Sequence, residues 1–322
     1  MGQTCSCNDK DEEQEVKVDV KKGGKEKQQS TMAQNNSNYK AATPQTVKIQ
    51  KAIQSILNIL QKNGISEPDQ DGLQYIDELA FDNGAIYKGY MKDGMRHGNG
   101  VQVWPDGARY EGEWSKNQAN GKGKFWHADG DIYEGDWRGN QFIDLKYVLD
   151  DKANGYGVYI HVNGARYEGY WKNDLQDGSG VETWSDGSRY QGEYKEGQKH
   201  GKGKYIWNDG SCYDGYWYEN KINGYGVYEW PDGRRYQGEW KDNNMHGKGL
   251  YTWKDGRMYD GEYQNDRKHG FGTYTWADGR QYIGYWLNGK QHGEGRYKQN
   301  NNVERKGLWE DGKRLKWLDG EQ

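Results

Sequence analysis

The chain has 322 residues, with 45 basic and 49 acidic side chains and a formal net charge of −4. Leu, Ile, Val and Phe together number only 41, too few for an ordinary packed core, whereas 15 Trp, 27 Tyr and 48 Gly are present. A disordered chain would lack these aromatic residues, and the near-neutral charge gives no general attraction for nucleic acid. Composition therefore predicts a folded chain with an aromatic core spaced by glycine.

Residues 1–42 form the first predicted segment, a polar and disordered tail. Its start, with Gly2 followed by a serine at the required spacing, fits the N-myristoylation pattern. Cys5 and Cys7 are candidates for palmitoylation, because a second acyl chain makes a marginal anchor stable. The alternative is an ordinary polar N-terminus whose cysteines have no such role. No apolar run predicts a transmembrane helix or a secretion signal, so we expect the cytosol.

Residues 43–63 form the second segment, a predicted amphipathic helix. It begins at Thr43 and ends at Asn63, and apolar residues recur between them at spacings of three and four. Three roles remain open. The helix covers the open aromatic edge of the first hairpin, or binds a partner helix, or binds calmodulin, although Gln54 and Ile59 replace the basic residues of an IQ motif.

A repeat of 23 residues occupies residues 79–312. If its tyrosine is numbered position 0, position 2 is glycine in all ten units and position 4 is aromatic in nine. If an 11-residue insertion in the unit at Tyr133 is discounted, positions 11 and 13 are glycine in the nine units long enough to have them, and positions 19 and 20 are usually Asp-Gly. The units begin, in order, at Tyr87, Tyr110, Tyr133, Tyr167, Tyr190, Tyr213, Tyr236, Tyr259, Tyr282 and Arg305.

Each unit predicts an antiparallel β-hairpin. Because side chains alternate along a strand, positions 0, 2 and 4 share one face, and positions 11, 13, 15 and 17 share one face of the next strand. We expect the polar residues between these strands to form the hairpin loop, and Asp-Gly to form the tight return turn. If positions 2 and 13 face each other, a neighbouring ring covers the gap that the glycines leave. Stacked hairpins then make an all-β, elongated and twisted array.

The same register assigns the two faces of the hairpins. The predicted repeat core comprises Tyr110, Gly112, Trp114, Tyr190, Gly192, Trp207, Tyr236, Gly238, Trp240, Trp253 and Trp276. On the other face, position 1 meets position 14 and position 3 meets position 12, which favours pairs of opposite charge. The expected pairs are Glu111–Lys124, Glu113–Lys122, Glu193–Lys202 and Glu239–Lys248.

These motifs, such as YEGEW at Tyr110–Trp114 and RHGNG at Arg96–Gly100, resemble the MORN repeat family. The resemblance implies a non-catalytic, elongated β-array used for protein assembly and, in several members, for membrane contact. The unit at Tyr133 departs from the motif through an insertion. The last unit has Arg305 in place of tyrosine and no second-strand motif, so residues 313–322 are predicted to be a C-terminal tail.

The insertion at residues 140–153 concentrates aliphatic side chains where the array otherwise has few. A protruding apolar loop indicates a partner-binding site. The alternative is a loop that folds back to cover exposed rings on neighbouring repeats. The candidate residues are Phe142, Ile143, Leu145, Tyr147, Val148 and Leu149.

No residue pattern predicts catalysis, a metal or a cofactor. Five of the seven histidines fall at position 10, but adjacent repeats are about 9–10 Å apart, so two of them do not easily share a metal. We expect these histidines to lie in the hairpin loops. The recurring paired carboxylates indicate a solvated face, and the repeat glycines do not form a phosphate-binding loop. We expect no enzyme.

Three functions remain open from the sequence. The first is a non-enzymatic scaffold held by acylation at the cytoplasmic face of a membrane, where the array binds proteins. The second is a structural subunit of a ciliary or cytoskeletal assembly, since similar arrays occur in radial spoke heads. The third is binding of phosphoinositides, although residues 43–322 have 38 basic and 42 acidic side chains. Association between copies of the chain also stays open.

Overall fold

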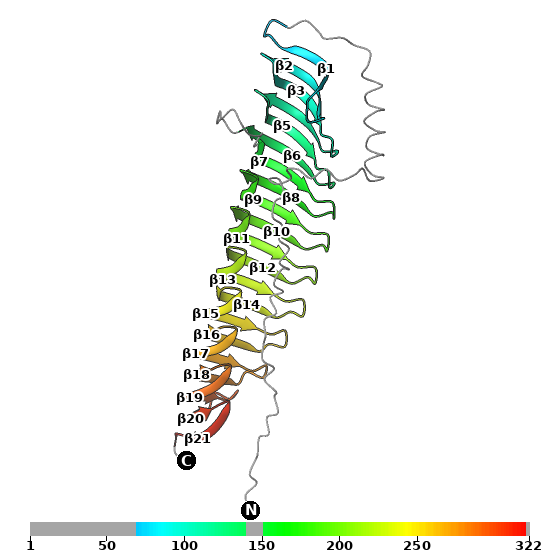
Figure 1. Ribbon diagram of the computed structural model, residues 1–322. Helices are drawn as coiled ribbons and strands as arrows, with labels where there is room; N and C mark the ends of the chain where they lie inside the picture. The colour runs from blue at the N-terminus through cyan, green and yellow to red at the C-terminus, as the bar shows by residue number, and fades with distance from the viewer. Residues whose placement is uncertain (1–68, 140–150, 320–322) are drawn as a thin grey trace, which may run out of the picture. The chain divides into compact units, whose positions relative to one another are not determined.

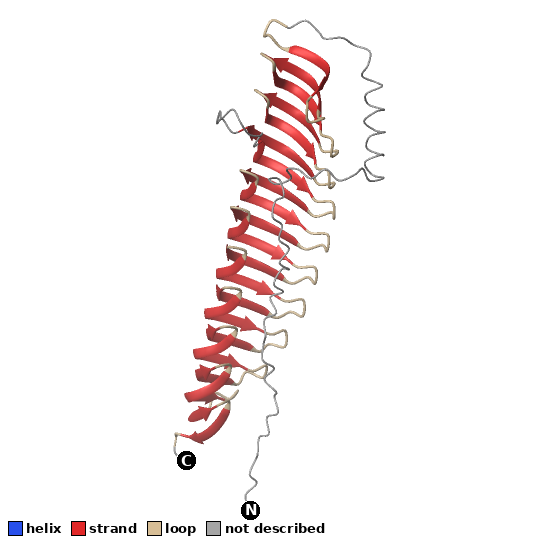
Figure 2. Ribbon diagram, viewed as in Figure 1, coloured by secondary structure: helices blue, strands red, loops and turns tan. Residues whose placement is uncertain are grey.

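The structure, a computed structural model, describes residues 69–139 and 151–319. These residues form 21 β-strands and no helix (Figures 1 and 2). They divide into two compact units, one ending at Asn208 and the other beginning at Asp209. The prediction of an all-β array of antiparallel hairpins is confirmed, whereas the predicted helix at 43–63 lies outside the described residues.

The N-terminal unit contains eleven strands, and each pairs antiparallel with its neighbours in sequence (Figure 1). The first strand starts at Gln74, earlier than the predicted start of the array at residue 79. The strands are β1 (Gln74–Ala80), β2 (Ile86–Lys92), β3 (Met95–Val103), β4 (Arg109–Ser115), β5 (Gln118–Trp126), β6 (Ile132–Gly139), β7 (Asp151–Ile160), β8 (Arg166–Lys172), β9 (Leu175–Thr183), β10 (Arg189–Lys195) and β11 (Gln198–Ile206).

The C-terminal unit contains ten strands with the same sequential pairing. They are β12 (Cys212–Tyr218), β13 (Lys221–Glu229), β14 (Arg235–Lys241), β15 (Asn244–Thr252), β16 (Met258–Gln264), β17 (Arg267–Thr275), β18 (Gln281–Leu287), β19 (Lys290–Lys298), β20 (Glu304–Glu310) and β21 (Lys313–Trp317).

The last strand corrects the prediction of a C-terminal tail from residue 313. β21 pairs with β20 although it lacks the repeat glycines and tyrosine. Arg305 and Arg314 both stack on Trp317, with 4.3 and 4.1 Å between each guanidinium carbon and the ring centroid. Cation–π contacts of this kind stabilise the final hairpin without the motif.

The predicted register is correct for the first half of each hairpin. Gly112 lies opposite Gly123, Tyr110 lies opposite Phe125, and Glu111 lies opposite its predicted partner at position 14. We call the two facing residues at positions 2 and 13 the paired glycines. Their alignment places the repeat tyrosine and the aromatic residue at position 15 on one face, which we call the ring face.

Beyond the paired glycines a β-bulge shifts the register, so the predicted pairing of positions 3 and 12 is wrong. In the repeat that begins at Tyr190, Glu193 lies opposite His200 instead of Lys202. The glycine at position 11, here Gly201 with φ of 60°, allows the extra residues of the bulge. The predicted pairs Glu113–Lys122 and Glu239–Lys248 fail for the same reason.

The acidic side chain at position 3 closes the bulge through a backbone hydrogen bond. The Lys122 N–H donates to Glu113 Oε1 at 2.8 Å, and the Lys248 N–H donates to Glu239 Oε1 at 3.1 Å. Position 3 therefore contacts the main chain of position 12 and not its side chain. The carboxylate satisfies an N–H that the bulge removes from the strand ladder.

Each repeat tyrosine lies over the paired glycines of its own repeat. The hydroxyl of Tyr236 donates to the C=O of Glu239 at 2.9 Å, so its ring crosses Gly238. A Cβ placed on Gly238 would lie 2.6 Å from Tyr236 Oη and 2.5 Å from Gly249 Cα, a separation that only glycine avoids. The sequence predicts a neighbouring ring in this place, but the ring comes from the same repeat.

A tryptophan or tyrosine at position 4 then packs between successive repeat tyrosines. The ring centroid of Trp240 lies 5.0 Å from that of Tyr236 and 5.6 Å from that of Tyr213, with interplanar angles of 89° and 83°. Edge-to-face pairs are worth about 0.5–1.5 kcal/mol beyond the burial of their area. Both tyrosines are fully buried. Within the N-terminal unit and within the C-terminal unit, this ladder of perpendicular rings forms the core.

Two kinds of turn join the strands, and the sequence prediction assigns them the wrong way round. The strands of one repeat are joined by a two-residue turn, such as Lys116-Asn117, with φ of 50° and 70°. Positive φ at both residues defines the type I′ turn, which favours Asn, Asp and Gly. The Asp-Gly instead lies in the longer loop between repeats, where the Gly107 N–H donates to the C=O of Trp104 at 3.0 Å.

The second residue of the two-residue turn ties its repeat to the preceding one. The N–H of Asn243 donates to the C=O of Ile222 at 3.0 Å, and that of Asp266 donates to the C=O of Met245 at 3.1 Å. The side-chain oxygens of Asn243 and Asp266 accept the N–H of the same two residues at 2.7 Å. These paired bonds connect adjacent turns.

Asp266 makes this connection with a carboxylate where Asn243 uses an uncharged amide. Burial raises the pKa of Asp266 to about 6, although the N–H of Met245 opposes the shift. A raised carboxyl pKa means that the folded state binds the proton more tightly than the unfolded state. The corresponding stability is fully present below about pH 4 and is lost as the pH rises through about 6.

We expect Asp266→Asn to raise the free energy of unfolding of the C-terminal unit above pH 6 by up to about 1 kcal/mol, allowing for partial exposure of the carboxylate. Below about pH 4 the two proteins should be equally stable, because the carboxyl group is protonated. Urea unfolding at several pH values, followed by tryptophan fluorescence, measures the difference. The reciprocal change Asn243→Asp should lose stability above pH 6. A difference that does not vary with pH would contradict the assignment.

Candidate partner-binding surface

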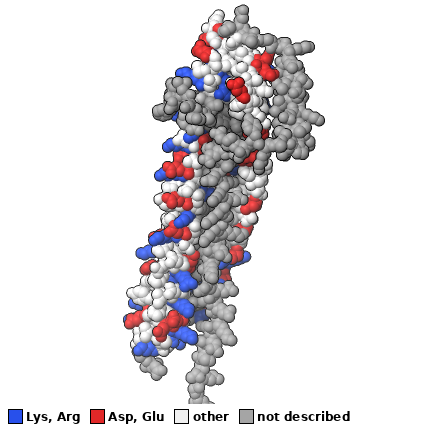
Figure 3. Space-filling view, in the orientation of Figure 1, with Lys and Arg blue, Asp and Glu red and all other residues white. Residues whose placement is uncertain are grey.

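The face opposite the rings, which we call the outer face, carries positions 1, 3, 12 and 14. Between neighbouring repeats, position 12 lies opposite position 3 of the next repeat. Lys122 lies opposite Asp136 and forms an ion pair with it, and Lys248 lies opposite Glu262. Figure 3 shows basic and acidic side chains intermixed on the visible surface. Exposed pairs of this kind contribute little to stability, typically 0–1 kcal/mol.

Aromatic pairs occupy this place on the outer face three times. One of them, Tyr75–Tyr90, joins the first strand to the first repeat, and its Tyr75 is half-buried. The other two lie between repeats. Tyr156 lies opposite Tyr170 in the N-terminal unit, and Phe271 lies opposite Tyr285 in the C-terminal unit. The ring centroids are 5.5 and 5.4 Å apart, and both pairs are edge to face. We call them the outer aromatic pairs.

All four rings of the outer aromatic pairs are exposed to solvent. The exposed fraction is 42% for Tyr156, 51% for Tyr170, 48% for Phe271 and 55% for Tyr285. By contrast, the repeat tyrosines on the ring face are buried. Position 3 also loses its acidic side chain in these two repeats, so Tyr170 and Tyr285 have no carboxylate to close the bulge. The outer aromatic pairs therefore keep ring area in contact with solvent.

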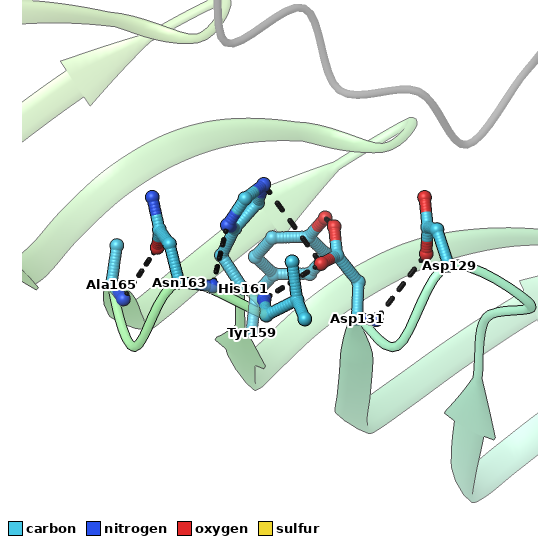
Figure 4. Close-up of polar contacts among 7 residues, drawn as sticks. Asp129, Asp131, Tyr159, His161, Asn163 and Ala165 are labelled. Atoms are coloured by element: carbon cyan, nitrogen blue, oxygen red, sulfur yellow. Dashed lines mark hydrogen bonds and ion pairs between the residues drawn. The ribbon is translucent and has the colours of Figure 1, made fainter.

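A second unusual cluster lies in the loops that follow β5 and β7 (Figure 4). Tyr159 donates its hydroxyl to Asp131, whose other oxygen accepts the N–H of Val162 at 2.9 Å. His161 Nε2 lies 3.9 Å from the same carboxylate, and Asp131 is only 4% exposed. The cluster ties together two loops that are separated by a full repeat and the insertion.

The protonation states in this cluster do not support a nucleophile. Burial raises the pKa of Tyr159, and its hydrogen bond to Asp131 raises it further, so the phenol keeps its proton. Burial lowers the pKa of the nearby His127, which favours its neutral form. Among residues 69–139 and 151–319, no group of three or more His, Cys, Asp or Glu side chains could hold a metal ion. The contacts of Asp131 with Tyr159 and Val162 therefore connect the two loops.

A half-buried lysine on the ring face is likewise explained by its neighbours. Lys199 Nζ lies 4.7 Å from the ring centroid of Trp184 and 3.7 Å from Glu182 Oε2. Burial lowers the pKa of Lys199, while the Glu182 carboxylate opposes the shift. Tyr194 donates its hydroxyl to the same carboxylate at 2.8 Å. The lysine is thus held as part of a buried polar group.

The residues predicted as the repeat core lie on the ring face. Tyr110, Tyr190, Tyr236, Trp114 and Trp240 are each at most 3% exposed. Gly112, Gly192 and Gly238 are members of the paired glycines. Trp207 is 7% exposed, whereas Trp253 and Trp276 are half-buried and pack on the position 15 rings of the following repeats.

Two groups of candidate site residues lie outside the described residues. These are the lipidation candidates Gly2, Cys5 and Cys7, and the insertion candidates Phe142, Ile143, Leu145, Tyr147, Val148 and Leu149. The prediction that the position 10 histidines lie in hairpin loops is wrong: His97, His200, His246, His269 and His292 all lie within strands, next to the bulge glycine.

The sequence profile of the MORN repeat matches nine segments that together cover more than half of the chain. The chain therefore belongs to the MORN-repeat family. The matched segments are residues 87–109, 110–132, 148–166, 167–189, 190–212, 213–234, 236–256, 259–279 and 282–303. The unit that begins at Arg305 is not matched, although β20 and β21 form its hairpin.

Some solved structures have a weak likeness to this chain. The TCP10 domain of Danio rerio CPAP, solved with a peptide of STIL, is 13% identical, with 76% of this chain and 98% of that chain covered and a TM-score of 0.39. The TCP domain of Drosophila melanogaster SAS-4, solved with a proline-rich motif of Ana2, is 11% identical, with 54% and 90% covered and a TM-score of 0.32. At these TM-scores the likeness carries no argument. The curated proteins gave no match.

The part of the chain that the structure describes contains no helix with the length and apolar character needed to cross a membrane.

Proposed function

We propose that this chain is a non-enzymatic scaffold that binds protein partners through the outer aromatic pairs and is held at the cytoplasmic face of a membrane by N-terminal acylation. The observation that carries the proposal is the replacement of charged outer-face residues by exposed rings at Tyr156–Tyr170 and Phe271–Tyr285. Exposed aromatic residues are typical of protein interfaces.

Energetics favour binding as the role of these rings. A cross-strand pair contributes about 0.2–1 kcal/mol whether it is charged or aromatic, so the fold gains little from the exchange. In water, each exposed ring keeps apolar area that a partner could bury at about 25 cal/mol per Å². Tyrosine is also among the residues that dominate binding energy at interfaces. A partner that presents apolar or aromatic side chains fits this surface best.

The membrane part of the proposal rests on the sequence. Gly2 and the serine four residues later fit the myristoylation pattern, and Cys5 and Cys7 provide sites for a second acyl chain. Direct phosphoinositide binding by the array is a weaker alternative. On the outer face Lys122 and Lys124 are already paired with acidic side chains of the next strand.

We expect the double variant Phe271→Lys/Tyr285→Glu to lose partner binding while it keeps its fold. The change copies Lys248 and Glu262, which face each other at the equivalent place one repeat earlier. Thermal unfolding should therefore differ by no more than about 0.5 kcal/mol. Proximity labelling in cells, followed by binding of the purified candidates, should show loss of a defined set of partners. The matched control Lys248→Ala should keep them, and an unchanged set in the double variant would refute the role of the rings.

We expect Gly2→Ala to move the chain from the membrane fraction to the soluble fraction, because acylation requires glycine at this position. Gln3→Ala, which leaves the pattern intact, is the control. Fractionation after detergent treatment separates the alternatives, since an acylated scaffold dissolves in detergent whereas a cytoskeletal subunit stays with the insoluble assembly. Full membrane binding by Gly2→Ala would contradict the acyl anchor.

A further inference from the structure

The first and last strands each present an edge without a strand partner among the described residues. β1 pairs with β2 and β21 pairs with β20, and no described strand pairs with their other sides. An edge strand exposes backbone N–H and C=O groups that a strand from another chain can pair with. These two edges therefore offer backbone groups with which a strand of another chain could pair.

The two terminal strands themselves carry opposite charge. Residues 69–82, which include β1, have five acidic side chains and no lysine or arginine: Asp69, Asp71, Asp77, Glu78 and Asp82. Within β21 there are three basic side chains and no acidic one, Lys313, Arg314 and Lys316, whereas β1 itself contains Asp77 and Glu78. The acidic residues Glu310, Asp311 and Asp319 lie outside β21, on either side of it. All three basic side chains of β21 are exposed, as are four of the five acidic side chains of residues 69–82.

Charge selects which edges can meet. Two β1 edges would bring acidic side chains together, and two β21 edges would bring basic side chains together, so both symmetric contacts are repelled. Only β21 against β1 places opposite charges side by side. Charged side chains on edge strands usually prevent association, but here they prevent only the like-with-like contacts.

Backbone pairing at this contact is short, because a bulge interrupts each terminal strand. In β1 the bulge falls between Ile76 and Leu79, and β21 has its own irregularity opposite Leu308 and Trp309. Leu315, which is 56% exposed, adds apolar area at the basic edge. With few backbone bonds available, electrostatic attraction supplies much of the contact, so it should weaken as salt is added.

We propose that copies of this chain associate head to tail, with the β21 edge of one copy against the β1 edge of the next. Such a contact joins two different surfaces, so it continues from copy to copy instead of closing into a symmetric dimer. The proposal goes beyond partner binding, because it makes the chain an assembly unit that repeats its outer aromatic pairs along a larger structure.

Sedimentation velocity of the full-length protein over a range of concentrations tests the proposal. In about 0.05 M NaCl we expect species larger than a dimer that grow with concentration, and about 0.5 M NaCl should shift them toward the monomer. A protein that stays monomeric at about 100 μM in low salt would overturn the proposal, and so would a closed dimer. Monomers would also indicate that other residues of the chain cover the edges.

Charge reversal identifies the edges and provides a matched rescue. The variants Lys313→Glu/Lys316→Glu and Asp71→Lys/Glu78→Lys change exposed side chains only, and each should weaken self-association at least tenfold. Mixed together, the two variants should associate again, because each reversed edge then meets an opposite charge. Association that survives in either variant alone, or a mixture no stronger than its components, would overturn the contact between these edges.

Discussion

A tyrosine ring lying across two facing glycines is the contact on which the rest of the structure depends. The hydroxyl of Tyr236 is fixed by the C=O of Glu239, and its ring fills the space left by Gly238 and Gly249. Glycine normally weakens a strand because it has no side chain to pack. Here the two glycines form a site for the side chain of their own repeat, and the flat surface that results receives Trp240.

This arrangement separates stability from recognition. The ring face supplies the core, so the side chains of the outer face can differ from repeat to repeat. Lys248 faces Glu262 at one place and Phe271 faces Tyr285 at the equivalent place one repeat later, and the backbone pairing is the same. The same separation explains the ends of the chain. There the ladder of rings stops, and the terminal strands differ from the repeats in both charge and motif. The surfaces that we propose for binding are therefore those that the core leaves free to vary.

The repeat period was sufficient to predict the hairpins and the pairing of Gly112 with Gly123, because both follow from spacing. Spacing does not reveal the sign of φ, so the bulge at Gly201 and the type I′ turns were missed, although Asn, Asp or Gly in each two-residue turn was a usable signal. Phe271 is also visible in the sequence as an aromatic residue at position 12, where three other repeats have Lys122, Lys202 and Lys248. The Asp131–Tyr159 contact was not predictable, since the insertion separates its two loops.

Hydrogen exchange measured by mass spectrometry on Gly238→Ala tests most directly whether the ring over the glycines holds the repeats together. The added Cβ would lie 2.5 Å from Gly249 Cα and 2.6 Å from Tyr236 Oη, so it should push apart the paired glycines and displace the ring, at a cost of about 2–3 kcal/mol. Amides of β14 and β15 should then exchange much faster, whereas those of β20 should keep their protection. Gly256→Ala, in a loop with no atom within 4 Å of the new Cβ, is the control for backbone strain alone. Equal protection in the two variants would contradict the account.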